Sequence, residues 1–339
     1  MTDEERRDSG STATDEERRD NGSTAAPLPE PPAPELPGYT AEPIAAEEAL
    51  LEDRSGAFTP YTLAADFLEL REIYAGSLER VKEESWSKRT SDRRPNGWTL
   101  RQTLAHVDAV AHLYNAAIEL GLAGRPVEIA SFTRREDLRA MNQAAMDARA
   151  ELPVTELCAS FLGALEESAR LAGRLEPQLL RLQVPVPFYG AAPTLGELFG
   201  GSLCHAGIVH GAQMSSSRTH PIWHFFPPGL MRRQLTRFFH VLGLVYWPER
   251  GHNLHATIGF SAEGQGGGSW MVRAHPSGGK GNIGIARTTD VAIHFASADL
   301  LCRVVTGSGL PWRQIALRQI RVSGNLRLAM RLPALFKPT

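Results

Sequence analysis

Two segments of this 339-residue chain begin in the same way, and each carries a histidine within an apolar stretch. The first begins at Thr99, with Gln102 three residues later, and the second begins at Thr194, with Glu197 three residues later. This spacing is typical of a capping box, in which both side chains bond to backbone N–H groups of the first helical turn. Both segments are therefore expected to be helices.

The histidines of these two segments are predicted to face the protein interior. At about 100° per residue, His210 lies within an apolar stripe that comprises Leu195, Phe199, Leu203 and Ala206. His106 lies between two apolar faces of its segment, a pattern typical of a central helix in a bundle. Two inward histidines on two central helices form a candidate metal or catalytic site.

Helical periodicity extends over the first half of the folded chain. Apolar residues recur every three to four positions in segments 61–84, 99–120, 134–149, 155–175 and 194–214. Proline and glycine separate these segments, and the proline-rich stretch 184–193 forms a long connection before the last one. The sequence thus predicts a bundle of four or five helices over residues 56–219.

The periodicity changes after residue 220. A helix over about 230–246 precedes segments that alternate or run apolar as strands do, at 254–261, 270–275, 282–286 and 291–296. A helix over 297–305, a strand over 319–323 and a helix over 325–336 follow. Residues 220–339 are therefore predicted to form an α+β domain, in which the glycine run 264–268 is a strand turn and not a phosphate loop.

Residues 1–55 are predicted to form a disordered, acidic, proline-rich tail. Segment 2–13 is repeated at 14–25 with one substitution. Residues 1–54 carry 15 acidic and 5 basic residues, whereas residues 220–339 carry 4 acidic and 14 basic residues. The basic domain could attract the tail, an anionic ligand, a carrier protein or an acidic surface, or it could simply be solvated. Nucleic acid is not expected, because the arginines are dispersed and no binding motif accompanies them.

The three cysteines argue for a reducing compartment. Cys158, Cys204 and Cys302 are far apart and odd in number, which disfavours a disulfide framework. Cys204 is expected to be a small buried residue rather than a nucleophile. With no apolar stretch of about 20 residues and no signal-peptide pattern, a cytoplasmic protein without a membrane span is expected.

Both halves of the chain show a resemblance to known families. Segment 97–106 resembles the second-helix signature of the DinB-like superfamily, which includes mycothiol-dependent maleylpyruvate isomerases, and segments 194–198 and 210–213 resemble its last-helix signature. Segments 257–260, 290–293, 297–301 and 322–325 resemble an SCP2-type sterol-carrier domain. The resemblance implies a DinB-like bundle followed by an SCP2-like domain, with a zinc-like divalent metal and mycothiol as candidate cofactors.

In the DinB-like family, one histidine on the second helix and two ligands four residues apart on the last helix hold the metal. This chain matches at His106 and His210 but has Ala206 at the remaining position. The neighbouring His205 is five residues from His210, about 140° away on a regular helix, so both cannot face one ion there. The ligand set is therefore incomplete in a regular helix.

Three alternatives follow from this gap. A π-bulge could bring His205 round to serve as a third ligand. Two histidines could recruit a ligand from elsewhere. The site could also hold no metal, with Ala206 and Gly207 leaving room beside His210 for an organic ligand and with His210 as acid or base. Without such a bulge, His205 is expected to be incidental, as are His112 and His220. Trp98 and Trp270 are expected to be core aromatics.

The first functional hypothesis is an isomerase or thiol-dependent transferase that acts on a small hydrophobic organic molecule, a chemistry that fits bacterial secondary metabolism. One alternative is a metal-free isomerase or cyclase of a biosynthetic intermediate. Another is a non-catalytic carrier that binds a hydrophobic ligand in the SCP2-like domain.

Overall fold

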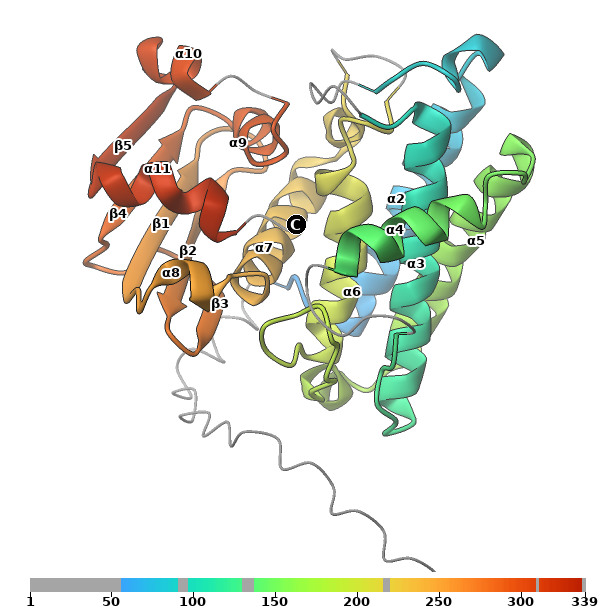
Figure 1. Ribbon diagram of the computed structural model, residues 1–339, viewed down its shortest axis with the longest axis horizontal. Helices are drawn as coiled ribbons and strands as arrows, with labels where there is room; N and C mark the ends of the chain where they lie inside the picture. The colour runs from blue at the N-terminus through green and yellow to red at the C-terminus, as the bar shows by residue number, and fades with distance from the viewer. Residues whose placement is uncertain (1–55, 91–96, 130–136, 216–219, 309–310, 337–339) are drawn as a thin grey trace, which may run out of the picture. The chain divides into compact units, whose positions relative to one another are not determined.

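The computed structural model describes residues 56–90, 97–129, 137–215, 220–308 and 311–336 (Figure 1). The predictions for the tail, residues 1–55, lie outside these ranges. None of the helices in the described ranges is long and apolar enough to cross a membrane.

Three long helices form the helical layer: α2 (Pro60–Glu79), α3 (Leu100–Leu122) and α5 (Val154–Gly173). Helix α5 packs against both α2 and α3, these two helices also contact α6 (Leu195–Cys204), and the shorter α4 (Leu138–Asp147) contacts α3 (Figure 1). Leu63, Phe67, Phe161 and Phe199 are among the fully buried residues of this core. The short 3₁₀ helices η1 (Glu83–Ser85) and η3 (Pro177–Arg181) lie in the connections that follow α2 and α5. The helical bundle predicted from the sequence is therefore present.

Both predicted capping boxes are present. The Thr99 hydroxyl accepts a hydrogen bond from the backbone N–H of Gln102 at 3.1 Å, and the Gln102 side chain accepts one from the Thr99 N–H at 2.9 Å. Thr194 and Glu197 make the equivalent pair of bonds, at 3.2 and 2.8 Å. Local sequence thus determines where α3 and α6 begin. The prediction of one regular helix over 194–214 is wrong, because α6 ends at Cys204 and a π-helix follows.

The C-terminal part begins with the 3₁₀ helix η5 (Ile222–Phe225) and helix α7 (Pro228–Leu244). It contains a five-stranded mixed sheet in the order β3-β2-β1-β4-β5. The strands are β1 (Ala256–Ala262), β2 (Gly268–His275), β3 (Gly278–Ile283), β4 (Val291–Phe295) and β5 (Ile320–Gly324). Strands β1 and β4 are parallel, and the other neighbours are antiparallel.

The remaining helices are α8 (Pro248–Gly251), α9 (Ala298–Val305), α10 (Pro311–Ala316) and α11 (Leu326–Leu335). All five predicted strands occur, but α8 and α10 were not expected. Strand β3 also begins four residues earlier than predicted. The reason is close packing, because a Cβ on Gly281 would lie 1.9 Å from the Phe239 carbonyl oxygen. The strand therefore needs glycine at this position, and glycine interrupts the pattern of apolar side chains by which a strand is predicted.

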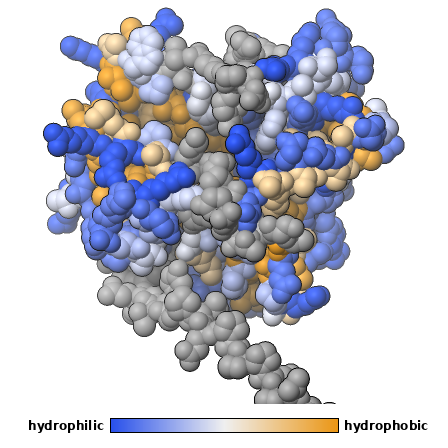
Figure 2. All heavy atoms as spheres, viewed as in Figure 1, coloured by the Kyte–Doolittle hydropathy of each residue, from blue (hydrophilic) through white to orange (hydrophobic). Residues whose placement is uncertain are grey.

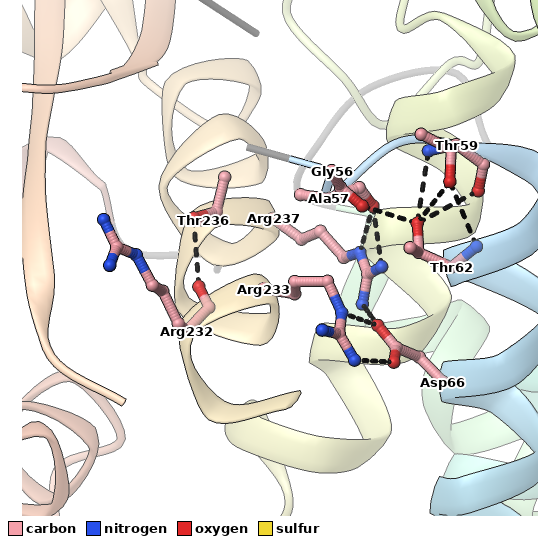
Figure 3. Close-up of polar contacts among 9 residues, drawn as sticks. All are labelled: Gly56, Ala57, Thr59, Thr62, Asp66, Arg232, Arg233, Thr236 and Arg237. Atoms are coloured by element: carbon pink, nitrogen blue, oxygen red, sulfur yellow. Dashed lines mark hydrogen bonds and ion pairs between the residues drawn. The ribbon is translucent and has the colours of Figure 1, made fainter. Parts of the chain in front are cut away.

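Helix α7 contacts α6 as well as strands β2 and β3. A buried ion-pair group also joins α7 to α2 (Figure 3). Arg237 Nη1 lies 2.6 Å from Asp66 Oδ2, and Arg233 Nε donates to the same oxygen at 2.8 Å. Arg237 also donates to the Ala57 carbonyl oxygen at 2.6 and 2.9 Å. Asp66 and Arg237 are fully buried, so loss of one charge would leave its partner uncompensated in the interior.

Candidate metal centre

Three histidines from two helices converge at one place in the helical layer. His106 comes from the middle of α3, while His205 and His210 come from the segment directly after α6. The His106 and His205 Nε2 atoms are 3.2 Å apart. One ring nitrogen from each of the three residues falls within 4.8 Å of the others. His106 and His210 are buried and His205 is partly exposed, so the cluster lies at the edge of the core.

A π-helical turn, η4 (His205–Val209), makes this convergence geometrically feasible. The His210 N–H donates to the His205 carbonyl oxygen, five residues earlier, at 3.0 Å. In a regular helix it would bond to the Ala206 carbonyl oxygen instead. The wider turn places the His205 and His210 rings with their centroids 4.5 Å apart. The π-bulge that the first alternative requires is thus present, and the roles of the three histidines as metal ligands stay predictions.

The Ala206 carbonyl oxygen accepts a hydrogen bond from a side chain in place of the His210 N–H. The Tyr74 hydroxyl of α2 donates to this oxygen at 2.7 Å. Tyr74 is fully buried, and burial raises the pKa of its phenol, so the hydroxyl remains a neutral donor. A buried carbonyl group without a partner would be costly. Tyr74 therefore stabilises the widened turn, and sequence analysis did not identify it.

Two glycines allow the chain to pass through this turn. A Cβ on Gly211 would lie 2.3 Å from the Gly207 carbonyl oxygen and 2.8 Å from the Trp223 ring. A Cβ on Gly207 would lie 3.0 Å from the Phe226 ring. Such distances are incompatible with a side chain at Gly211 unless the backbone moves. The pair of glycines four residues apart is the sequence signal that could have indicated an irregular helix here.

Trp98 forms a wall of the histidine cluster. Its indole is nearly parallel to the His210 ring, with 6.2 Å between centroids, and its centroid is 4.7 Å from that of His106. Trp98 is partly exposed, so its prediction as a core aromatic is wrong. Trp270, in contrast, is buried in the C-terminal core, as predicted.

The electrostatic environment keeps two of the imidazoles neutral. Burial lowers the pKa of His106 well below its usual value, and proximity to His210 lowers it further. Burial has the same effect on the pKa of His205, aided by both neighbouring histidines. Neutral imidazole is the form that binds a metal ion. His106 Nδ1 is also buried without a hydrogen-bond partner in the described ranges.

The donor set fits a zinc-like ion. Two nitrogen ligands of a tetrahedral zinc ion lie about 3.3 Å apart, close to the 3.2 Å between the His106 and His205 nitrogens. Three histidines with a fourth position open to another molecule are typical of catalytic zinc sites. No other group of three or more histidine, cysteine or acidic residues with this proximity occurs in the described part of the chain.

The remaining candidate residues lie outside the cluster. His112 contacts Ser160 and Asp108, and the His220 ring contacts His224. Cys204 is buried, which raises the pKa of its thiol to about 12. Because the thiolate is the reactive form, Cys204 is unsuited to act as a nucleophile, in agreement with the expectation from sequence.

A cavity of about 430 Å³ lies near the π-helical turn. Trp223 and Phe226 line it, and these two rings also approach Gly211 and Gly207 of the turn. Phe225, Met231 and Asp299 contribute further to the wall. The Asp299 carboxylate accepts hydrogen bonds from Trp223 Nε1 at 2.8 Å and from Arg303 Nε at 2.8 Å. The lining thus combines aromatic side chains with polar ones, among them His224 and the hydrogen-bonded Asp299, and includes none of the three clustered histidines.

These features define a protein with a histidine cluster in a helical layer and a five-stranded mixed sheet in its C-terminal part. No family model and no curated protein matches the sequence. Among solved structures, the fold is similar to that of a mycothiol-dependent maleylpyruvate isomerase, with a TM-score of 0.50 and 11% identity over 75% of this chain and 92% of that chain. A variant of that isomerase gives a TM-score of 0.51 and 11% identity, over 79% of this chain and 95% of the other.

Sterol carrier protein 2 from Yarrowia lipolytica gives a TM-score of only 0.23, with 19% identity over 27% of this chain and 73% of that chain. The SCP2-like part of the predicted fold therefore stays a prediction. The similarity in overall fold to the isomerase, in contrast, extends over most of both chains.

Proposed function

We propose that this protein is a metal-dependent enzyme, an isomerase or thiol-dependent transferase, that acts on a small organic molecule. His106, His205 and His210 would hold a divalent cation such as zinc. The observation that carries the proposal is the convergence of three imidazoles at a π-helical turn. An incidental group of core histidines would not require the backbone to depart from a regular helix, and such departures are frequent at functional sites.

The residues of the site have separable tasks in this proposal. A bound divalent cation would acidify a water molecule or thiol and polarise a substrate carbonyl group. The Gln213 side chain contacts His210 Nδ1 and orients that ring. The Trp98 indole covers one side of the cluster and supplies an apolar surface for the substrate. Tyr74 acts through the Ala206 carbonyl group and is a positioning residue.

Mycothiol is the thiol that we propose as cofactor. The support is the similarity in fold to the mycothiol-dependent maleylpyruvate isomerase. We propose a hydrophobic organic substrate, because the neighbouring cavity of about 430 Å³ has aromatic walls and a volume suited to a small ligand.

The direct test compares zinc-loaded protein with protein freed of metal by a chelator. Maleylpyruvate is supplied with and without mycothiol, and its isomerisation is followed by absorbance. We expect turnover that needs both zinc and mycothiol, that is lost in His205→Ala and that is retained in His112→Ala. Equal turnover in chelated protein would contradict the metal-dependent proposal and support acid–base chemistry by His210 without metal.

A second candidate function is non-catalytic binding of a hydrophobic ligand. The apolar side chains of Trp223, Phe226 and Met231 in the cavity lining favour it. Fluorescence of 1-anilinonaphthalene-8-sulfonate would report such binding. In the carrier case, Met231→Arg abolishes dye binding, His205→Ala leaves it unchanged and no turnover occurs with either metal or thiol. Turnover that depends on His205 would exclude a purely carrier role.

A further inference from the structure

The short helix α10 and the segment after it expose apolar side chains to solvent. Trp312 is 69% exposed, and Ile315 and Leu317 are about half exposed. Helix α10 has no buried residue at all. It contacts strand β5 at the edge of the sheet. A tryptophan and two aliphatic side chains exposed within six residues are more than isolated surface hydrophobics.

Helix α11, which follows β5, has a second exposed apolar strip. Leu328, Leu332 and Leu335 are buried, and the helix contacts β4 and β5. On the solvent side, Leu326 is 60% exposed and Met330 is 76% exposed. These two residues are one helical turn apart and therefore lie on the same face. Helix α11 thus exposes two apolar side chains to solvent in addition to those that it buries.

Arginines alternate with these apolar residues along the sequence. Residues 300–339 contain seven basic residues and no acidic residue. Five arginines on or next to α10, β5 and α11 are exposed, namely Arg313, Arg318, Arg321, Arg327 and Arg331. Figure 2 shows hydrophobic and hydrophilic residues side by side over this part of the surface, at its upper left. We define the C-terminal face as these five arginines together with Trp312, Ile315, Leu317, Leu326 and Met330.

We propose that the C-terminal face docks on the surface of an anionic lipid bilayer. Apolar side chains interleaved with arginines match the two layers of such a surface, because the apolar groups enter the acyl boundary and the guanidinium groups contact lipid phosphates. An exposed tryptophan suits the interfacial region in particular. The uniform positive charge of this segment complements anionic headgroups. This docking is independent of the histidine cluster and of the proposed enzymatic activity.

The lining of the cavities supports a broad surface as the partner. The cavities lined by Trp86 and by Trp223 contain no residue of the C-terminal face. A protein segment that binds by insertion would need a groove, whereas a lipid surface needs only a protruding face. Glu263, 3.6 Å from Arg321, is the one carboxylate that forms an ion pair with the face in the described ranges. The positive charge is therefore largely available to lipid.

The test is flotation of the full chain with phosphatidylcholine vesicles in which about one-quarter of the lipid is phosphatidylglycerol. We expect binding to these vesicles and little binding to pure phosphatidylcholine. Arg313→Gln and Arg327→Gln should each weaken binding about fivefold. Trp312→Ser combined with Met330→Ser should weaken it more than about tenfold, because both apolar contacts are lost.

Matched controls come from the helical layer. Tyr61, on α2, is 81% exposed, and Arg125 is an exposed arginine, so Tyr61→Ser and Arg125→Gln remove similar groups elsewhere. Both should leave flotation unchanged. Equal binding to neutral vesicles, or unchanged binding in the Trp312→Ser, Met330→Ser variant, would overturn the proposal. A dimer in sedimentation velocity that this double variant abolishes would also overturn it, by showing that the face joins two copies of the chain.

Discussion

Helices α3 and α6 begin alike and deliver their histidines differently. Each starts with a capping box, but α3 continues regularly for 23 residues and supplies His106, whereas α6 lasts for 10 residues before η4 supplies His205 and His210. A regular helix cannot place residues five apart on one side. The comparison shows that the third histidine depends on backbone irregularity, which Tyr74 and Gly211 accommodate.

The largest expected effect comes from filling the tight turn. Gly211→Ala should destabilise the protein by about 3 kcal/mol, because its Cβ would meet the Gly207 carbonyl oxygen at 2.3 Å. Urea unfolding measures this change. Gly163→Ala on the regular helix α5 is the control, since its Cβ would have no neighbour within 4 Å. Equal stability in the two variants would show that the turn is not as tight as described.

Loss of the Tyr74 hydroxyl is expected to have the next largest effect. Tyr74→Phe removes the donor to the Ala206 carbonyl oxygen and should cost about 2 kcal/mol. Cobalt(II) affinity should also fall about tenfold, because the turn that places His205 is no longer held. Tyr61→Phe on the same helix is the exposed control. Cobalt(II) affinity equal to that of the wild type would remove Tyr74 from the account of the site.

The shared capping boxes predict a smaller and symmetrical effect. Thr99→Ala and Thr194→Ala should each cost about 1 kcal/mol of stability, because each removes the acceptor for one backbone N–H. Thermal unfolding of the two variants measures the difference. Thr194→Ala should keep the metal, since the ten residues of α6 separate Thr194 from η4. Loss of metal in Thr194→Ala alone would mean that the start of α6 also determines the geometry of η4.

The smallest expected effect is a pH dependence of protein stability that involves the regular helix α3. Burial raises the pKa of Asp108 on α3, but hydrogen bonds from His112, Arg149 and Ser160 outweigh it and hold the pKa below its usual value. A carboxyl group whose pKa is lower in the folded than in the unfolded state stabilises the protein at pH values above its unfolded-state pKa. This contribution to stability is lost as pH falls through the folded-state pKa. Asp108→Asn should therefore flatten the loss of stability below about pH 4.

Acid titration followed by circular dichroism measures this pH dependence. Asp147→Asn, at an exposed position on α4, provides the control and should leave the acid transition unchanged. An unaltered acid transition in Asp108→Asn would show that its hydrogen bonds do not favour the charged form.

Local signals accounted for much of the fold. The capping boxes predicted the starts of α3 and α6, and apolar spacing predicted the bundle and the five strands. Strand β3 began earlier than predicted because its first residues are glycines that pack against α7. The ion pair between Asp66 and Arg237 was not predicted, because the two residues are 171 positions apart and neither carries a local signal.

The candidate site was only partly predictable. His106 and His210 followed from inward-facing positions, and their roles as ligands remain a prediction. The position of His205 depends on whether the turn after α6 is regular or π-helical. Contacts with residues far away in the sequence determine which of the two forms. The Tyr74 hydroxyl approaches Ala206 from a helix 132 residues away in sequence. No pattern within the last helix could reveal that partner.

Cobalt(II) titration of the purified full chain, followed by visible absorption, tests the central claim most directly. We predict one ion per chain with the intense absorption of a tetrahedral site. His106→Ala, His205→Ala and His210→Ala should each lose that absorption and bind at least about 100-fold more weakly, whereas His112→Ala should match the wild type. If His205→Ala binds cobalt(II) as tightly as the wild type and with the same spectrum, the π-helical turn does not build the metal site.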